Sequence, residues 1–137
     1  MKKLFSAQPF QFQLIALTRV FFGALIANHG LMVFNSEAMQ QMATMLGEGG
    51  MPTPTLLAYL AKGSEFFGGV LLALGLFTRA AIIPLVITML VAAFGAHKGQ
   101  IFGEGEHAFL FLLAFVTFFF TGAGKWSFDN FLFKTKK

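Results

Sequence analysis

The sequence predicts an all-α protein: a transmembrane four-helix bundle with a short interfacial helix between its first and second spans. Two features of composition carry this prediction, namely a mean hydropathy of +0.71 and a charged fraction of only 12% in a chain with 20 phenylalanines. The third feature is a set of four apolar segments near the length of about 20 residues that a helix needs to cross a membrane. Together they are typical of a protein embedded in lipid.

The four predicted spans cover residues 14–34, 56–77, 80–96 and 108–124. Too few residues remain outside them for a separate soluble domain, so residues 1–137 are expected to form one integral membrane domain. The basic pair Lys2 and Lys3 is followed by Gln8 and Pro9 rather than by an apolar run. This start indicates a retained first helix and not a cleaved signal.

The connection after the first span contains the stretch "SEAMQQMATML", with an apolar face at helical spacing. This face predicts an amphipathic helix lying at the outer interface, with Ser36 as its N-cap and Glu37 in its first turn. Glycines and prolines in "GEGGMPTP" then end the helix. The methionines of this stretch, Met39, Met42 and Met45, suit apolar packing. Binding of a soft Cu(I) ion by their sulfur atoms is the alternative.

Between the second and third spans only Thr78 and Arg79 interrupt the apolar sequence, which predicts two antiparallel neighbouring helices. Pro84 lies too deep in the third span to be a first helical residue, so we expect a local bend there. After the fourth span, Lys125 and Trp126 suit the level of the lipid headgroups.

The net charge of +4 does not indicate nucleic-acid binding, because the basic residues lie at the ends of apolar spans and form no stripe. In the four-span topology Lys98 lies on one side, and seven basic residues lie on the other: Lys2, Lys3, Arg79, Lys125, Lys134, Lys136 and Lys137. The positive-inside rule then predicts a multi-pass protein of a bacterial-type cytoplasmic membrane, in contact with the bilayer and with both termini cytoplasmic.

Ionisable residues within predicted spans are expected to face the bundle interior and to find partners there. Glu65 is expected about 13 Å below the outer surface, near mid-membrane. The sequence therefore favours a buried Arg19–Glu65 ion pair, with Gly68 and Gly69 allowing close helix packing. Lys62, one turn nearer the surface, is expected to snorkel outward.

A second polar group is expected at the outer ends of the helices, where His29, His97, Glu106 and His107 would line a pocket above Glu65. Three interpretations stay open. In the first, the polar groups hydrogen-bond to one another and bind no ligand. In the second, they form a small-molecule or quinone pocket in which a histidine and a carboxylate handle protons. In the third, they hold a metal or haem. For the last, the candidate ligands are His29, His97, His107 and Glu104, the final two in a Glu-x-x-His spacing.

In this order the residues resemble the DoxX family of small four-helix membrane proteins. "RVFFGALIANHG" matches its first-span pattern at Arg19, Gly23, His29 and Gly30, and "EFFGGVLLALGLFTRAA" matches its next signature at Glu65, Gly68, Gly69, Gly75 and Arg79. "GAGKWSFD" is similar to its terminal motif through Gly122, Gly124, Ser127 and Asp129, while His97 and Glu106 match a histidine and a glutamate of the third and fourth helices. The chain departs from the family at Val33, where a lysine is common, and at Ala123, where a proline is common.

The resemblance implies a membrane subunit associated with redox chemistry, since the namesake proteins belong to a thiosulfate:quinone oxidoreductase. The chain has no cysteine, which excludes thiol chemistry of its own, so electrons would come through a membrane or soluble redox partner. We therefore expect a subunit of a quinone-linked oxidoreductase, whether or not it turns over substrate itself. The alternatives are a non-enzymatic binding or scaffold protein and a metal- or haem-binding bundle, and exposed stripes of small residues also suit a homo-oligomer.

Overall fold

The structure, a computed structural model, describes residues 13–134, and this part of the chain forms helices and no strand. This confirms the all-α prediction. The elements are α1 (Gln13–Gly30) with its 3-10 continuation η1 (Leu31–Phe34), α2 (Ser36–Glu48), α3 (Pro54–Leu74), α4 (Thr78–Leu90) with its π-helical continuation η2 (Val91–Ala96), α5 (Glu106–Thr121) and α6 (Phe128–Leu132).

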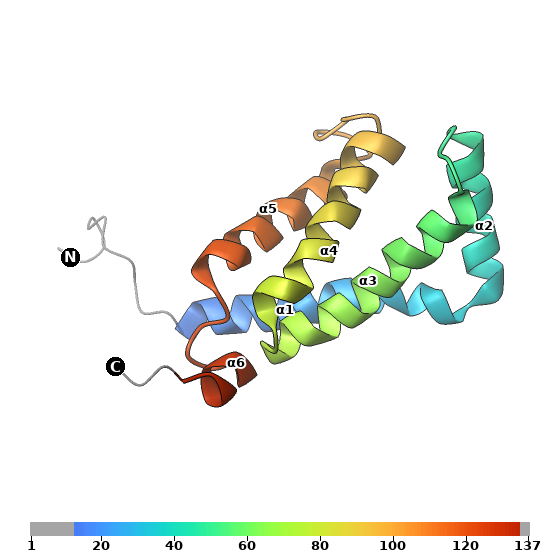
Figure 1. The fold of residues 1–137 in the computed structure, drawn as a ribbon. Coiled ribbons are helices and arrows are strands. Elements are labelled where there is room, and N and C mark those ends of the chain that lie inside the picture. The colour runs from blue at the N-terminus through green and yellow to red at the C-terminus, as the bar shows by residue number, and fades with distance from the viewer. Residues whose placement is uncertain (1–12, 135–137) are drawn as a thin grey trace.

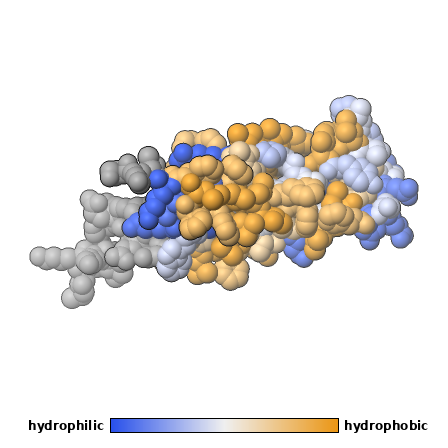
Figure 2. All heavy atoms as spheres, turned by 60° about the horizontal axis from the view of Figure 1, so that its bottom comes forward, coloured by the Kyte–Doolittle hydropathy of each residue, from blue (hydrophilic) through white to orange (hydrophobic). Residues whose placement is uncertain are grey.

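Within residues 13–134, three helical stretches are long and apolar enough to cross a membrane: Leu14–Phe34, Pro54–Leu74 and Thr78–Ala96. The fourth, α5, has 16 residues and is about 24 Å long at 1.5 Å per residue, short of a hydrocarbon layer of about 30 Å. It ends before the expected residue 124 because Gly122 and Gly124 have φ angles of 75° and 80°, outside the helical region. Apolar side chains cover the middle of the face seen in Figure 2, and hydrophilic ones gather towards both ends.

The helices pack in the order α1, α3, α4, α5, and α1 meets α5 over only a short stretch. Figure 1 shows α1 and α3 running side by side, with the α4–α5 pair diverging from them towards the end of the molecule where α2 lies. At the opposite end, α6 lies beside the turn between α3 and α4. A cavity lies between the helices at the α2 end, so the bundle is open there, whereas the segment that includes α6 is hydrogen-bonded to the turn at the other end.

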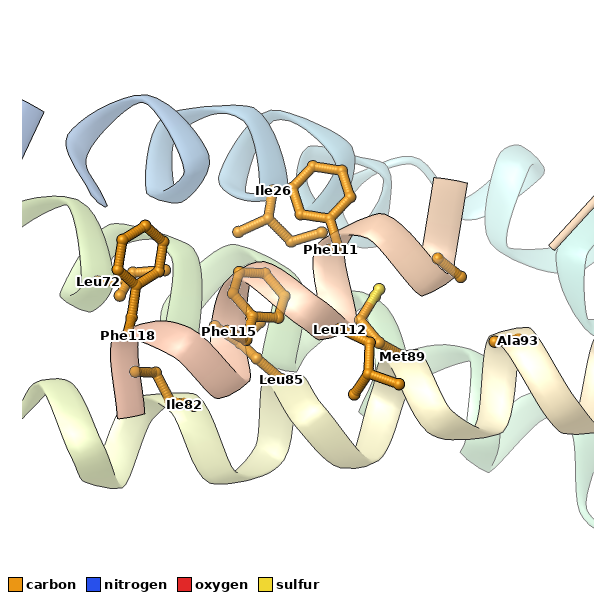
Figure 3. Packing of buried hydrophobic residues seen from close by; sticks show 11 residues of the cluster. Ile26, Leu72, Ile82, Leu85, Met89, Ala93, Phe111, Leu112, Phe115 and Phe118 are labelled. Carbon is orange, nitrogen blue, oxygen red and sulfur yellow. The ribbon is translucent and has the colours of Figure 1, made fainter. Parts of the chain in front are cut away.

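The hydrophobic core occupies the space between α5 and the other three long helices. Phe111, Leu112, Phe115 and Phe118 of α5 point towards side chains from α1, α3 and α4 (Figure 3). Phe115 is fully buried. Because lipid is as apolar as these side chains, the core is stabilised mainly by tight packing and not by removal of surface from water.

Glycines bring α1 and α3 into backbone contact, and one of them is Gly69, which was expected to allow close helix packing. A Cβ atom added to Gly23 would lie 2.4 Å from the backbone nitrogen of Ala73, and one added to Gly69 would lie 2.6 Å from that of Ala27. At Gly30 the distance to the nitrogen of Phe66 would be 2.1 Å. These contacts run the length of the interface, so they set the register in which the two antiparallel helices meet.

The turn between α3 and α4 differs from the prediction. Helix α3 ends at Leu74, three residues before the expected 77, because Gly75 adopts a left-handed conformation with φ of 67°. The connection is therefore residues 75–77, and Thr78 and Arg79 form the first turn of α4.

The segment that follows α5 holds this turn in place. The Asp129 carboxylate accepts hydrogen bonds from the amides of Phe77 and Thr78 at 2.6 and 2.8 Å. The Asp129 amide donates to the Gly75 carbonyl at 2.8 Å. A side chain distant in sequence thus supplies the N-terminal cap that α4 itself lacks.

Helix α2 begins at the predicted Ser36, but its N-cap is Asn35, whose side-chain oxygen accepts a hydrogen bond from the Ala38 amide at 3.1 Å. The Ser36 cap was therefore wrong by one residue. Glu37 lies in the first turn as expected, and Met39 is buried where α2 packs on α3 and η1. The bend at Pro84 stays a prediction; α4 continues through this residue to Leu90.

We expect Gly30→Ala to lower the free energy of unfolding by about 1–3 kcal/mol or more, because the added methyl group would collide with backbone atoms that cannot rotate away. Gly63→Ala is the matched control: it lies in α3 with no atom within 4 Å of its added Cβ, and should leave stability unchanged or raise it by up to about 1 kcal/mol. Denaturation in detergent, followed by circular dichroism, measures both. Equal effects of the two substitutions would contradict the close-packing account.

Candidate functional site

The candidate site is a cavity of about 750 Å³ at the open, α2 end of the bundle. Its walls come from α1, α2, α3, α4, η2 and the start of α5. Most of the lining is apolar, and the ionisable side chains on it are His29, Lys62, Glu65, His97, Glu104 and His107. A cavity of this size with a few convergent polar groups is typical of small-molecule sites.

Lys62 and Glu65 form a buried ion pair on the cavity wall. They lie three residues apart on α3, which places both side chains on the same face, and the Lys62 Nζ is 2.7 Å from the Glu65 Oε2. Both side chains are largely buried, with 13% and 7% of their surface exposed. The expectation that Lys62 snorkels outward is therefore wrong, since its ammonium group is held inside by the carboxylate.

The predicted Arg19–Glu65 ion pair is also wrong. Arg19 is 1% exposed, and its guanidinium donates to the carbonyl oxygens of Leu72, Ala73, Ala123 and Trp126, the last three at 2.7, 3.0 and 2.8 Å. Leu72 and Ala73 belong to the last turn of α3, where a cation is favoured, and the Leu72 carbonyl also accepts the Gly75 amide at 3.1 Å. Four hydrogen bonds to carbonyls replace the expected counter-charge.

The register of α1 on α3 explains this difference. Because the helices are antiparallel and Gly23 lies against Ala73, residues before Gly23 meet the end of α3. Glu65 is seven residues before Leu72 and so about 10 Å away along the helix. Gly30 lies against Phe66, so it is His29, not Arg19, that reaches the level of Glu65.

His29 and His107 bring α1 and α5 together at the cavity. Their ring centroids are 4.8 Å apart, and the ring of Phe111 packs against both at 6.2 and 4.9 Å. The two imidazoles contact each other directly, which leaves no room for a porphyrin between them. Both residues retain exposed surface.

His97 and Glu104 lie on the cavity lining as well, at the end of η2 and in the loop before α5. Glu106 does not: it is the exposed first residue of α5 and is absent from the lining. Among residues 13–134, no three His, Asp or Glu side chains are close enough together to hold a metal ion.

Two groups of cavity residues were missed from the sequence. Lys62 was assigned to the surface although its spacing from Glu65 favours a same-face pair. Helix α2 was expected only to lie flat at the interface, yet Met42, Met45 and Leu46 form one wall. The apolar face of α2 could have indicated this wall, since such a face is buried equally well against other helices or against lipid.

Comparison with known proteins gives a family and two relatives. The DoxX family model matches residues 14–98. An "Uncharacterized protein" of Haemophilus influenzae is 42% identical over 95 residues, covering 64% of this chain and 69% of the relative. "Putative oxidoreductase CatD" of Bacillus subtilis is 32% identical over 122 residues, covering 88% of each chain. No solved structure matches the chain significantly.

The assignment of ion pairs is tested by two double-mutant cycles. We expect the losses of unfolding free energy from Arg19→Gln and Glu65→Gln to add within about 0.5 kcal/mol, because the two side chains share no hydrogen bond. Lys62→Met and Glu65→Gln should instead couple by about 1 kcal/mol or more. Denaturant titration of the six proteins gives both coupling energies, and a larger coupling for Arg19 with Glu65 would overturn the assignment.

Proposed function

Because the chain belongs to the DoxX family and is a multi-pass membrane protein, we propose that it is a subunit of a quinone-linked oxidoreductase and that its cavity receives the quinone head group. The main support for this proposal is the Lys62–Glu65 ion pair on the wall of an otherwise mostly apolar cavity. The name of the Bacillus subtilis relative, "Putative oxidoreductase CatD", supports a redox role.

The ion pair has hydrogen-bonding capacity left for a ligand. Lys62 has three N–H donors and Glu65 has two acceptor oxygens, but among the described residues the pair makes only the bond between Nζ and Oε2. An apolar ring with two opposed oxygen atoms fits such a wall, because its carbonyls accept hydrogen bonds and its hydroxyls donate them. The donor and acceptor set on α3 therefore suits both the oxidised and the reduced form of a quinone.

The mouth of the cavity suits a lipid-soluble ligand. Leu60 of α3 and Ile87 of α4 line the cavity and are 57% and 55% exposed. In a membrane such apolar surface faces lipid, so a ligand with a long hydrocarbon tail can enter from the side between α3 and α4. A polar metabolite would have no comparable route through these residues.

A bound quinone supplies a two-electron, two-proton couple. The residues of this chain hold and move the protons: Lys62 orients a ligand oxygen, Glu65 carries a proton at its carboxylate inside the cavity, and His29 and His107 exchange it with the outer side. Since the chain has no cysteine, electrons arrive from a partner protein.

We further propose a cytoplasmic membrane of bacterial type, with the α6 end on the cytoplasmic side. Arg79, Lys125 and Lys134 lie at the α6 end, which supports this orientation, whereas Lys98 lies at the end where the cavity opens. The cavity then opens in the outer half of the bilayer, away from the cytoplasm.

Binding of decylubiquinone to the purified protein in detergent tests the proposal. We expect saturable binding that weakens about tenfold in Glu65→Gln and in Lys62→Met, since each substitution removes one charged hydrogen-bonding group. Glu37→Gln is the matched control, because this carboxylate lies in the first turn of α2 and not on the cavity. Isothermal titration calorimetry gives the dissociation constants.

Decylbenzene, which has a ring and tail but no oxygen atoms, separates specific binding from partition into detergent. Equal binding of decylbenzene, or an equal loss in Glu37→Gln, would reject the quinone site. Absence of saturable binding together with a stoichiometric co-purifying protein would favour the scaffold alternative. Haem absorption or stoichiometric metal in the same sample would favour the metal alternative.

A further inference from the structure

Two hydroxyl groups on the wall of the 750 Å³ cavity have no hydrogen-bond partner in the part of the chain that the structure describes. They belong to Ser64 of α3 and Thr88 of α4, which both line the cavity and are both partly buried. Within residues 13–134, the Thr78 Oγ1 is the one fully buried side-chain atom that lacks a partner. The Ser64 and Thr88 oxygens therefore keep surface that a molecule in the cavity can contact.

Other hydroxyls inside the helices are satisfied by their own backbone. Thr18, Thr44 and Thr117 each donate to the carbonyl four residues earlier, at 2.8, 2.9 and 2.8 Å. Such a bond is expected of a hydroxyl in a membrane helix, because lipid offers it no other partner. Ser64 and Thr88 also lie inside helices, but neither makes this bond. Both hydroxyls can therefore donate to, and accept from, a ligand.

The register of α3 on α4 places these two hydroxyls at the same level. A Cβ atom added to Gly68 would lie 2.9 Å from the Leu85 side chain, so these two residues mark where the helices face each other. Ser64 lies four residues before Gly68. Thr88 lies three residues after Leu85, and both spacings keep a residue on the same helix face. Because α3 and α4 are antiparallel, both hydroxyls lie about one turn beyond this contact, towards the α2 end.

The Lys62–Glu65 pair occupies another face of α3. A Cβ atom added to Gly69 would collide with the backbone of α1, so Gly69 marks the side of α3 that faces α1. Glu65 and Lys62 lie four and seven residues before Gly69 and share this side. Ser64 belongs to the side that faces α4, about 100° away around the helix. The cavity thus has two separate polar groups, an ion pair towards α1 and two hydroxyls towards α4, in a mostly apolar lining.

We propose that the Ser64 and Thr88 hydroxyls bind the second ring oxygen of the quinone, while the Lys62–Glu65 pair binds the first. This assignment rests on the proposed quinone site and narrows its ligand class. A 1,4-quinone has its oxygens on opposite sides of the ring, so one molecule reaches both polar groups. A 1,2-quinone has adjacent oxygens and reaches only one of them. Because a hydroxyl both donates and accepts, it binds the oxidised and the reduced ligand alike.

Two isomeric ligands test this selectivity: 2-decylhydroquinone, whose hydroxyls are opposed, and 4-decylcatechol, whose hydroxyls are adjacent. They contain the same atoms, ring and tail, so they partition similarly into detergent. Isothermal titration calorimetry of the purified protein under nitrogen gives both dissociation constants. We expect 2-decylhydroquinone to bind about tenfold more tightly, because it makes the additional hydrogen bonds on the α4 side.

Thr88→Val and Ser64→Ala each remove a hydroxyl that has no described protein partner, so both variants should fold as stably as the parent. Each should weaken binding of 2-decylhydroquinone about threefold to tenfold. Neither should change binding of 4-decylcatechol, which is expected at the ion pair because hydrogen bonds to charged groups are stronger. Thr117→Val is the matched control and should change neither affinity, since its hydroxyl bonds to the Leu113 carbonyl and lies outside the cavity lining.

The results separate this contact from the quinone site itself. Equal affinity of the parent for the two isomers would reject the second contact. An unchanged preference in both Thr88→Val and Ser64→Ala, or an equal loss in Thr117→Val, would also reject it, and saturable binding of decylubiquinone would then leave the quinone site in place. If decylubiquinone and both isomers show no saturable binding to the parent, the quinone site is rejected and this inference with it.

Discussion

The backbone contact between α1 and α3 determines where the polar residues of this protein meet. Gly23, Gly30 and Gly69 leave no space for side chains between the helices, so the two can slide past each other only by opening the whole interface. In the resulting register, Arg19 reaches the last turn of α3 and His29 reaches the level of Glu65. The different surroundings of Arg19 and His29 both follow from this one alignment.

The buried charges at the two ends differ in how fully they are satisfied. The guanidinium of Arg19 makes four hydrogen bonds to carbonyls and is sealed from its surroundings. The Lys62–Glu65 pair makes one hydrogen bond and faces a cavity. In a low-dielectric interior, unused donors and acceptors are costly and are kept where a ligand or proton uses them. This contrast, more than the presence of charge, separates the structural group from the functional candidate.

The sequence was a good guide to the helices and a poor one to their pairing. Apolar length and composition identified all four long helices, and Gly69 was expected to allow the close helix packing that it makes with α1. The partner of Glu65 was wrong because opposite charges on different helices were joined by depth alone, whereas a shift of seven residues along α3 separates them. The capping of α4 by Asp129 links residues about 50 positions apart, and no local pattern around Phe77 or Thr78 indicates it.

The acceptors of Arg19 also impose an order on biogenesis. Two of them, the carbonyls of Ala123 and Trp126, are made more than one hundred residues after the arginine itself. While the ribosome is still synthesising α3 to α5, the cation can be held only by the end of α3 or by water and headgroups at the membrane surface. The hydrogen bonds of Arg19 can therefore be completed only after the segment that follows α5 has been synthesised.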